Sequence, residues 1–189
     1  MKMKKILLLI CCLLLSWSAS ALELDGVKLA DSVHLGSRDL ILNGAGVRNK
    51  FFLDLYIAAL YIPEKKTSAA AVLSDPNEKR MALHLLRDIS ADRLLSAFNK
   101  AITANHSDAE LAALEASLKE FSAIFAKMGE VKKGEVVTLD YYPASGTMVS
   151  VNGAPKGTVA GAAFNTALMK VWLGDKPAQD DLKLKLLGQ

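Results

Sequence analysis

The chain has 189 residues, of which 23 are Lys or Arg, 20 are Asp or Glu and 2 are Cys. Three Lys residues and both Cys residues lie within the first twelve positions, so the remainder has equal numbers of acidic and basic residues and no cysteine. This balance argues against a nucleic-acid-binding protein, which needs a basic face to offset phosphate charge. The cysteine-free remainder also excludes disulfides, thiolate nucleophiles and Cys-based metal or cluster sites.

The first 21 residues have the three-part pattern of a secretory signal peptide. A basic segment at positions 1–5 precedes an unbroken apolar run at 6–15, and Ala19-Ser20-Ala21 forms a small-x-small cleavage site. The apolar run is too short to span a bilayer comfortably. We therefore expect cleavage after Ala21, export to the periplasm or to the outside, with the periplasm favoured, and no stable membrane anchor afterwards. Residues 22–189 are enough for one domain with a sizeable core.

The first part of this domain has strand patterns. Residues 22–29 form a short strand region with an Asp25-Gly26 turn signal, and residues 39–42 form another strand that ends at Asn43-Gly44-Ala45-Gly46. Residues 51–62 form a long strand closed by Pro63, in which Tyr56 and Ala58 share one face because side chains alternate. Residues 81–86 have the length of a further strand.

Helices are predicted in the middle of the chain. Ser90 is a suitable N-cap for a helix over residues 91–104. Ser107 and Glu110 have capping-box spacing at the start of a second helix, whose apolar residues recur at steps of three and four. Its core-facing stripe consists of Leu111, Leu114, Leu118, Phe121, Phe125 and Met128.

The last third returns to strands and then to helices. Residues 135–142 and 147–151 form a predicted hairpin, and a short strand follows at 158–159. A helix over 162–173 ends at Gly174, and residues 179–187 form a final amphipathic segment. This order of elements favours an α+β fold, with a large antiparallel sheet and helices packed on one face.

Few residues point to catalysis or to a cofactor. His34, His84 and His106 have no metal-like partners at short spacing, and no Gly-x-Ser-x-Gly elbow or Gly-rich phosphate loop is present. We therefore expect no metal and no organic cofactor. The most informative segment is Leu42 to Arg48, in which two glycines permit a bulge or tight turn. Arg48 then lies either exposed at that turn or in an apolar cleft, where it would hold a carboxylate or phenolate.

The same segment resembles a known family. Gly44-Ala45-Gly46-Val47-Arg48 is similar to a signature of the chalcone isomerase fold, and Leu60-Tyr61-Ile62 ends the next strand much as in that family. The likeness extends over most of the domain, with residues 157–173 on a helix that closes the cleft. It implies an open-faced sandwich of a large antiparallel sheet and helices on one side. It also implies a cleft-lining Arg48.

The resemblance implies functions as well. Plant members cyclise chalcones, and other members bind fatty acids with the matching Arg on the carboxylate. Catalytic members use that Arg, a Thr on the next strand, and a Tyr and an Asn on the first long helix. A gapless comparison places Arg48 on the Arg, Tyr56 on the Thr, Asp92 on the Tyr and Asn99 on the Asn. A one-residue slip would bring Arg93 to the position of Asp92.

Because two of these four positions differ, three hypotheses stay open. The first is an exported protein that binds a small apolar acid or a phenolic ligand at Arg48, Tyr56, Asp92 and Asn99, without chalcone isomerase activity. The second is an isomerase, an intramolecular lyase, in which Arg48 stabilises an oxyanion with help from Tyr56 or Asn99. The third is an envelope protein-interaction module with a vestigial, filled cleft. If Arg48 is structural, Asp92 is its expected partner.

Overall fold

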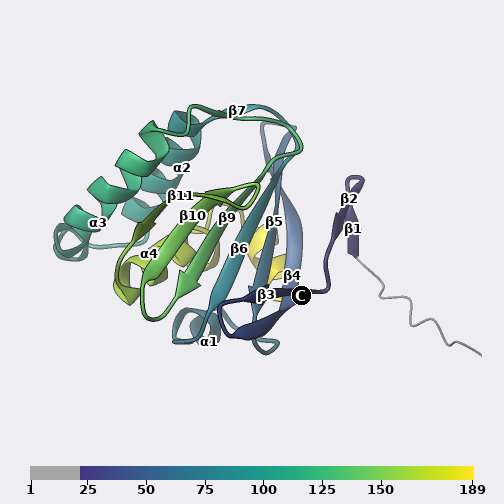
Figure 1. Ribbon diagram of the computed structural model, residues 1–189, viewed down its shortest axis with the longest axis horizontal. Helices are drawn as coiled ribbons and strands as arrows, with labels where there is room; N and C mark the ends of the chain where they lie inside the picture. The colour runs from purple at the N-terminus through teal and green to yellow at the C-terminus, as the bar shows by residue number, and fades with distance from the viewer. Residues whose placement is uncertain (1–21) are drawn as a thin grey trace, which may run out of the picture.

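The computed structural model describes residues 22–189, so the predicted signal peptide lies outside the described residues. Its main feature is a seven-stranded antiparallel sheet in the order β11-β10-β9-β6-β5-β4-β3 (Figure 1). The strands are β3 (Ser32–Leu35), β4 (Arg38–Lys50), β5 (Leu53–Ile62), β6 (Lys79–Leu85), β9 (Val136–Tyr142), β10 (Gly146–Val151) and β11 (Ala154–Val159).

Four short strands form two separate pairs. The β1 (Leu22–Leu24) and β2 (Val27–Leu29) strands form a hairpin around the predicted Asp25-Gly26 turn, and both turn residues have positive φ. Figure 1 shows this hairpin beside the main sheet, beyond β3 and β4. The β7 (Ile89–Ser90) and β8 (Glu130–Val131) strands pair with each other.

The sequence patterns did not predict β3, β7, β8 or helix α1 (Ala69–Leu73), since two to five residues are too few to show a periodicity.

The predicted capping residues mark the starts of two long helices and the end of a third. Ser90 accepts a hydrogen bond from the N–H of Arg93 and begins α2 (Ala91–Ala104). Ser107 and Glu110 form the predicted capping box of α3 (Asp108–Ala126). Helix α4 (Ala162–Leu173) ends at Gly174, and a short α5 (Asp180–Leu186) follows.

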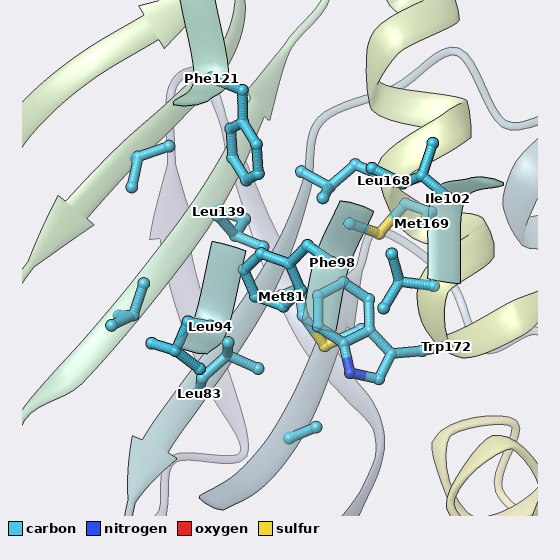
Figure 2. Packing of buried hydrophobic residues seen from close by; sticks show 14 of the residues in the cluster. Met81, Leu83, Leu94, Phe98, Ile102, Phe121, Leu139, Leu168, Met169 and Trp172 are labelled. Atoms are coloured by element: carbon cyan, nitrogen blue, oxygen red, sulfur yellow. The ribbon is translucent and has the colours of Figure 1, made fainter. Parts of the chain in front are cut away.

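These helices cover one face of the sheet and form the larger of two cores with it (Figure 1). Figure 2 shows Met81 and Leu83 from β6 packed with Phe98 from α2 and Trp172 from α4. The Phe98 ring lies with its centroid 5.6 Å from Trp172 and 5.7 Å from Phe125, both edge-on, which is a favourable aromatic arrangement. The stripe predicted for α3 belongs to this core, with Phe121 and Phe125 fully buried. The α+β architecture with helices on one sheet face is therefore confirmed.

A smaller core lies on the opposite sheet face, around Leu40, Ile57 and Tyr61. Both cores consist of residues between Leu24 and Leu187. None of the helices in residues 22–189 has the length and apolar character needed to cross a membrane.

The Gly44-Ala45-Gly46 segment is part of β4 and not a turn that ends a strand, which corrects the sequence prediction. The pairing of β4 with β5 shifts register between Leu42 and Gly44, so the bulge that the glycines permit is present. Helix α5 packs directly on the two glycines. A Cβ at Gly44 would lie 2.0 Å from the carbonyl oxygen of Lys185, and one at Gly46 would lie 2.9 Å from the Leu182 side chain. Glycine is needed here because a helix backbone approaches the strand.

Candidate ligand-binding site

A cleft of about 1130 Å³ opens between the β4–β5 hairpin, helix α2 and the connection from α4 to α5. Small-molecule sites typically occupy roughly 300–1,000 Å³, so the cleft has room for a ligand of that size. Its apolar walls come from several elements: Phe51, Leu53, Leu55, Ile89, Leu94, Ala97, Phe98, Ala101, Ala104, Val171, Pro177 and Ala178. A cleft of this volume is not the filled one that a vestigial site predicts.

Arg48 lines this cleft and is half-buried. Because side chains alternate along a strand, Arg48 shares a face of β4 with Gly44 and Gly46, the face on which α5 packs. Gln179, the N-cap residue of α5, accepts a hydrogen bond from Nη1 of Arg48 at 3.0 Å and another from the N–H of Asn49 at 3.0 Å. Nη1 also donates to the carbonyl oxygen of Asn49. A guanidinium has five N–H donors, so further donors remain for an anion.

Tyr56 lies opposite Arg48 on β5, where the two residues are direct cross-strand partners. Its side chain lines the cleft but is 5% exposed, and its hydroxyl accepts a hydrogen bond from Nε1 of Trp172 at 3.3 Å. Burial raises the pKa of the Tyr56 hydroxyl, and the Trp172 N–H and the Arg48 charge offset this effect only in part. The hydroxyl therefore stays protonated at neutral pH and has a proton to donate to a ligand.

The two other predicted site residues are placed differently. Asp92 lies in the first turn of α2 at the exposed rim of the cleft. A negatively charged carboxylate at this position is stabilised by the dipole of the helix N-terminus. Among residues 22–189, Asp92 makes no ion pair with Arg48, so the partner of Arg48 is the neutral Gln179. Arg93, the alternative from a one-residue slip, also lines the rim.

Asn99 does not line the cleft. It lies in a separate small pocket between α2 and α3 with Leu118 and Ser122, because it projects from another side of α2 than Leu94 and Phe98. Its buried Oδ1 has no hydrogen-bond partner in the described structure. The fold therefore brings Arg48 and Tyr56 together at the cleft, sets Asp92 at its rim and leaves Asn99 outside it.

Sequence reasoning did not identify Gln179 or Trp172. Gln179 is 131 residues from Arg48 along the chain, and no local pattern marks it. Trp172 lies on the helix that the family resemblance placed at the cleft, and it is the one tryptophan of residues 22–189, which could have drawn attention to it. Within the described part of the chain, no group of three or more His, Asp or Glu residues is arranged to hold a metal ion.

The fold and the cleft define the class of the protein: an α+β sandwich with one sheet face covered by helices and an Arg–Tyr pair at a cleft with apolar walls. The model of the chalcone isomerase-like family matches residues 21–188, and the chain belongs to this family. The fold is similar to that of a fatty-acid binding protein from Arabidopsis thaliana, with a TM-score of 0.65 and 13% sequence identity. That match covers 86% of this chain and 92% of the other. A search of curated protein sequences found no match.

Proposed function

We propose that the protein is an exported member of the chalcone isomerase-like family that binds a small apolar acid, or a phenolic ligand, in the cleft at Arg48. The observation that carries this proposal is the cross-strand pair of Arg48 and Tyr56 beside the apolar walls of the cleft. A carboxylate placed there receives charge-assisted hydrogen bonds from the guanidinium and a further bond from the protonated phenol. The alkyl or aromatic remainder then lies against the apolar walls.

The Arabidopsis thaliana protein of similar fold is a fatty-acid binding protein, which supports a carboxylate with an apolar chain as the first ligand class to test. The surroundings of Arg48 agree with such a ligand. Gln179 orients the guanidinium without neutralising it, because an amide oxygen carries no formal charge. The positive charge of Arg48 is thus left for an anionic ligand.

Ligand binding is favoured over catalysis because only two of the four family positions, Arg48 and Tyr56, are placed to contact the same end of a ligand in the cleft. Asn99, one of the two residues expected to supply a hydrogen bond in an isomerase, lies in another pocket. An isomerase would have to stabilise its oxyanion with Arg48 and Tyr56 alone. This second function stays open for an enone-like substrate, because both groups are placed to bind an oxyanion.

The test is a titration of a matched ligand series against the protein that starts at Leu22. Trp172 is its only tryptophan and contacts the Tyr56 hydroxyl, so its fluorescence is a direct probe of the site. Fatty acids of several chain lengths are compared with the alcohols of the same length, which keep the apolar part and lack the carboxylate. We expect the acids to bind at least about tenfold more tightly, since a hydrogen bond to a charged group contributes about 1.5–3 kcal/mol. Equal affinity of acid and alcohol would contradict the role of Arg48, and mass spectrometry of the denatured protein would identify a co-purified ligand.

A further inference from the structure

The turn between β4 and β5 exposes a contiguous apolar patch. Among residues 22–189, five large apolar side chains are exposed, and three of these are consecutive: Phe51 at 82%, Phe52 at 104% and Leu53 at 48%. Isolated exposed apolar residues are ordinary, but a contiguous group of them at a projecting turn commonly marks an interaction site. We call Phe51, Phe52 and Leu53 the hairpin tip.

The backbone conformation of this turn does not favour aromatic side chains, although Lys50 Nζ lies 5.5 Å from the centroid of the Phe51 ring. Lys50 pairs with Leu53, so Phe51 and Phe52 form a two-residue hairpin loop, and both have positive φ, 50° and 64°. Loops of this kind favour Asn-Gly, because a residue with a bulky side chain is strained in the left-handed region. The sequence therefore has two phenylalanines where the backbone favours other residues and where their rings are largely exposed to solvent.

Basic side chains surround the hairpin tip and the mouth of the cleft. Five of them line the cleft outside Arg48, and none forms an ion pair within 4 Å in the described part of the chain: Lys50, Arg87, Arg93, Lys100 and Lys176. The acidic residues that line the cleft are Asp88 and Asp92, of which Asp88 lies 3.6 Å from Lys132. The cleft lining thus has six basic residues, Arg48 included, and two acidic ones, so it has an excess of positive charge although residues 22–189 have none.

The hairpin tip and the cleft belong to the same end of the molecule. Phe51 and Leu53 both line the cleft, and the first turn of α2 forms its opposite rim. Figure 1 shows the β4–β5 turn near β7, which leads directly into α2. A flat partner that contacts the tip would therefore lie across the mouth of the cleft.

We propose that this end of the molecule docks on an anionic lipid surface, with the hairpin tip inserted among the headgroups and the cleft open towards the bilayer. Exposed aromatic and apolar side chains partition into the membrane interface, and Lys and Arg are attracted to anionic headgroups. Binding to an anionic lipid surface requires exposed apolar side chains and basic side chains without ion-pair partners, and this end of the molecule has both. The further role, in which an apolar acid passes from the bilayer to Arg48, rests on the proposed function, whereas docking does not.

The test is co-sedimentation of the protein that starts at Leu22 with lipid vesicles, in the absence of any fatty acid. Vesicles of phosphatidylcholine alone are compared with vesicles that contain phosphatidylglycerol. We expect binding to the anionic vesicles that weakens as salt is added, and weaker binding to the neutral ones. Replacing Lys50 or Lys100 by Gln should lower binding about fivefold each, as expected for one basic residue at the surface.

The decisive variant is Phe51→Asn/Phe52→Gly, which gives the turn the residues that its backbone prefers. We expect this variant to unfold at a temperature equal to or higher than that of the wild type and yet to bind anionic vesicles at least about tenfold more weakly. Leu184→Ser is the matched control, because Leu184 is an exposed apolar residue of α5 that does not line the cleft. Absence of vesicle binding by the wild type, or unchanged binding by the double variant, would overturn the proposal and indicate a protein partner for the tip. Because the fatty-acid titration contains no vesicles, docking and ligand binding can fail independently.

Discussion

Arg48 and Tyr56 are cross-strand partners on β4 and β5, and each is held by a residue from the C-terminal part of the chain. Gln179 binds the guanidinium of Arg48, and Trp172 donates to the hydroxyl of Tyr56. The pair is thus oriented before a ligand arrives, and this pre-organisation reduces the entropy lost on binding.

Arg48→Ala should weaken the binding of an apolar acid roughly ten- to a hundredfold, because a charge-assisted hydrogen bond is lost. Arg48→Lys should restore only part of the affinity, since an ammonium cannot reproduce the planar fork. The melting temperature should change little, because Gln179 keeps its bond to the N–H of Asn49. The measurement is a fluorescence titration with thermal melts, and Arg38→Ala, remote from the cleft, is the control. Equal affinities for Arg48→Ala and wild type would contradict the proposed role.

Tyr56→Phe should affect stability and binding together. The Trp172 N–H would lose its partner inside the core, which costs about 1–3 kcal/mol of unfolding free energy. Affinity for an acid should fall about three- to tenfold with the loss of one hydrogen bond. Tyr61→Phe is the matched control, because Tyr61 is equally buried on the other sheet face and its hydroxyl has no hydrogen bond in the described structure. Urea denaturation and ligand titration distinguish the two variants, and identical behaviour would argue against a role for the Tyr56 hydroxyl.

Gly44→Ala should destabilise the protein by about 3 kcal/mol or more, because the added Cβ would lie 2.0 Å from the carbonyl oxygen of Lys185. Helix α5 must then move away from β4 and release Gln179 from Arg48, so ligand affinity should fall as well. Ala45→Ser tests the neighbouring residue, which packs on the opposite sheet face and should be nearly neutral. Denaturant unfolding of both variants checks the prediction, and a wild-type midpoint for Gly44→Ala would show that the helix does not need the glycine.

Lys79 should make stability increase with pH under alkaline conditions. The Lys79 residue is 3% exposed, and burial lowers the pKa of its ammonium to about 8 from 10.5. Between pH 8 and 10.5 the unfolded chain binds a proton that the folded protein lacks, so stability rises with pH across this window. The slope is at most about 1.4 kcal/mol per pH unit.

The check for Lys79 is urea denaturation from pH 7.5 to 10. Lys79→Met should abolish the rise attributed to this residue, while the exposed Lys156→Met should retain it. The tyrosines titrate in all three proteins and cancel in the comparison. Parallel profiles for wild type and Lys79→Met would show that Lys79 does not carry this pH dependence.

The exported protein should begin at Leu22, as the Ala19-Ser20-Ala21 site predicts. Intact-mass analysis of protein recovered from the periplasm would show a chain shortened by residues 1–21. Ala21→Leu should impair this processing, because the cleavage site requires a small residue. Recovery of the full 20.3 kDa chain from the wild type would contradict the prediction.

The local sequence was sufficient to predict the long helices and the hairpin of β9 and β10. Capping groups act within four residues, so Ser90, Ser107 and Gly174 mark helix boundaries without knowledge of the rest of the fold. The apolar stripe of α3 likewise predicted the face that reaches the core. The motif up to Arg48 indicated the family and a residue that lines the candidate site.

Only the tertiary structure decided what surrounds Arg48. The glycines before it lie beneath α5, whose approach no local pattern shows, and Gln179 reaches Arg48 from 131 residues away. The same is true of Asn99, which is on the predicted helix but faces α3 and not the cleft. Helix existence follows from local hydrogen bonds and periodicity, whereas the rotation of a helix against a sheet depends on packing between distant segments. The residues of the site were therefore partly predictable, and their grouping was not.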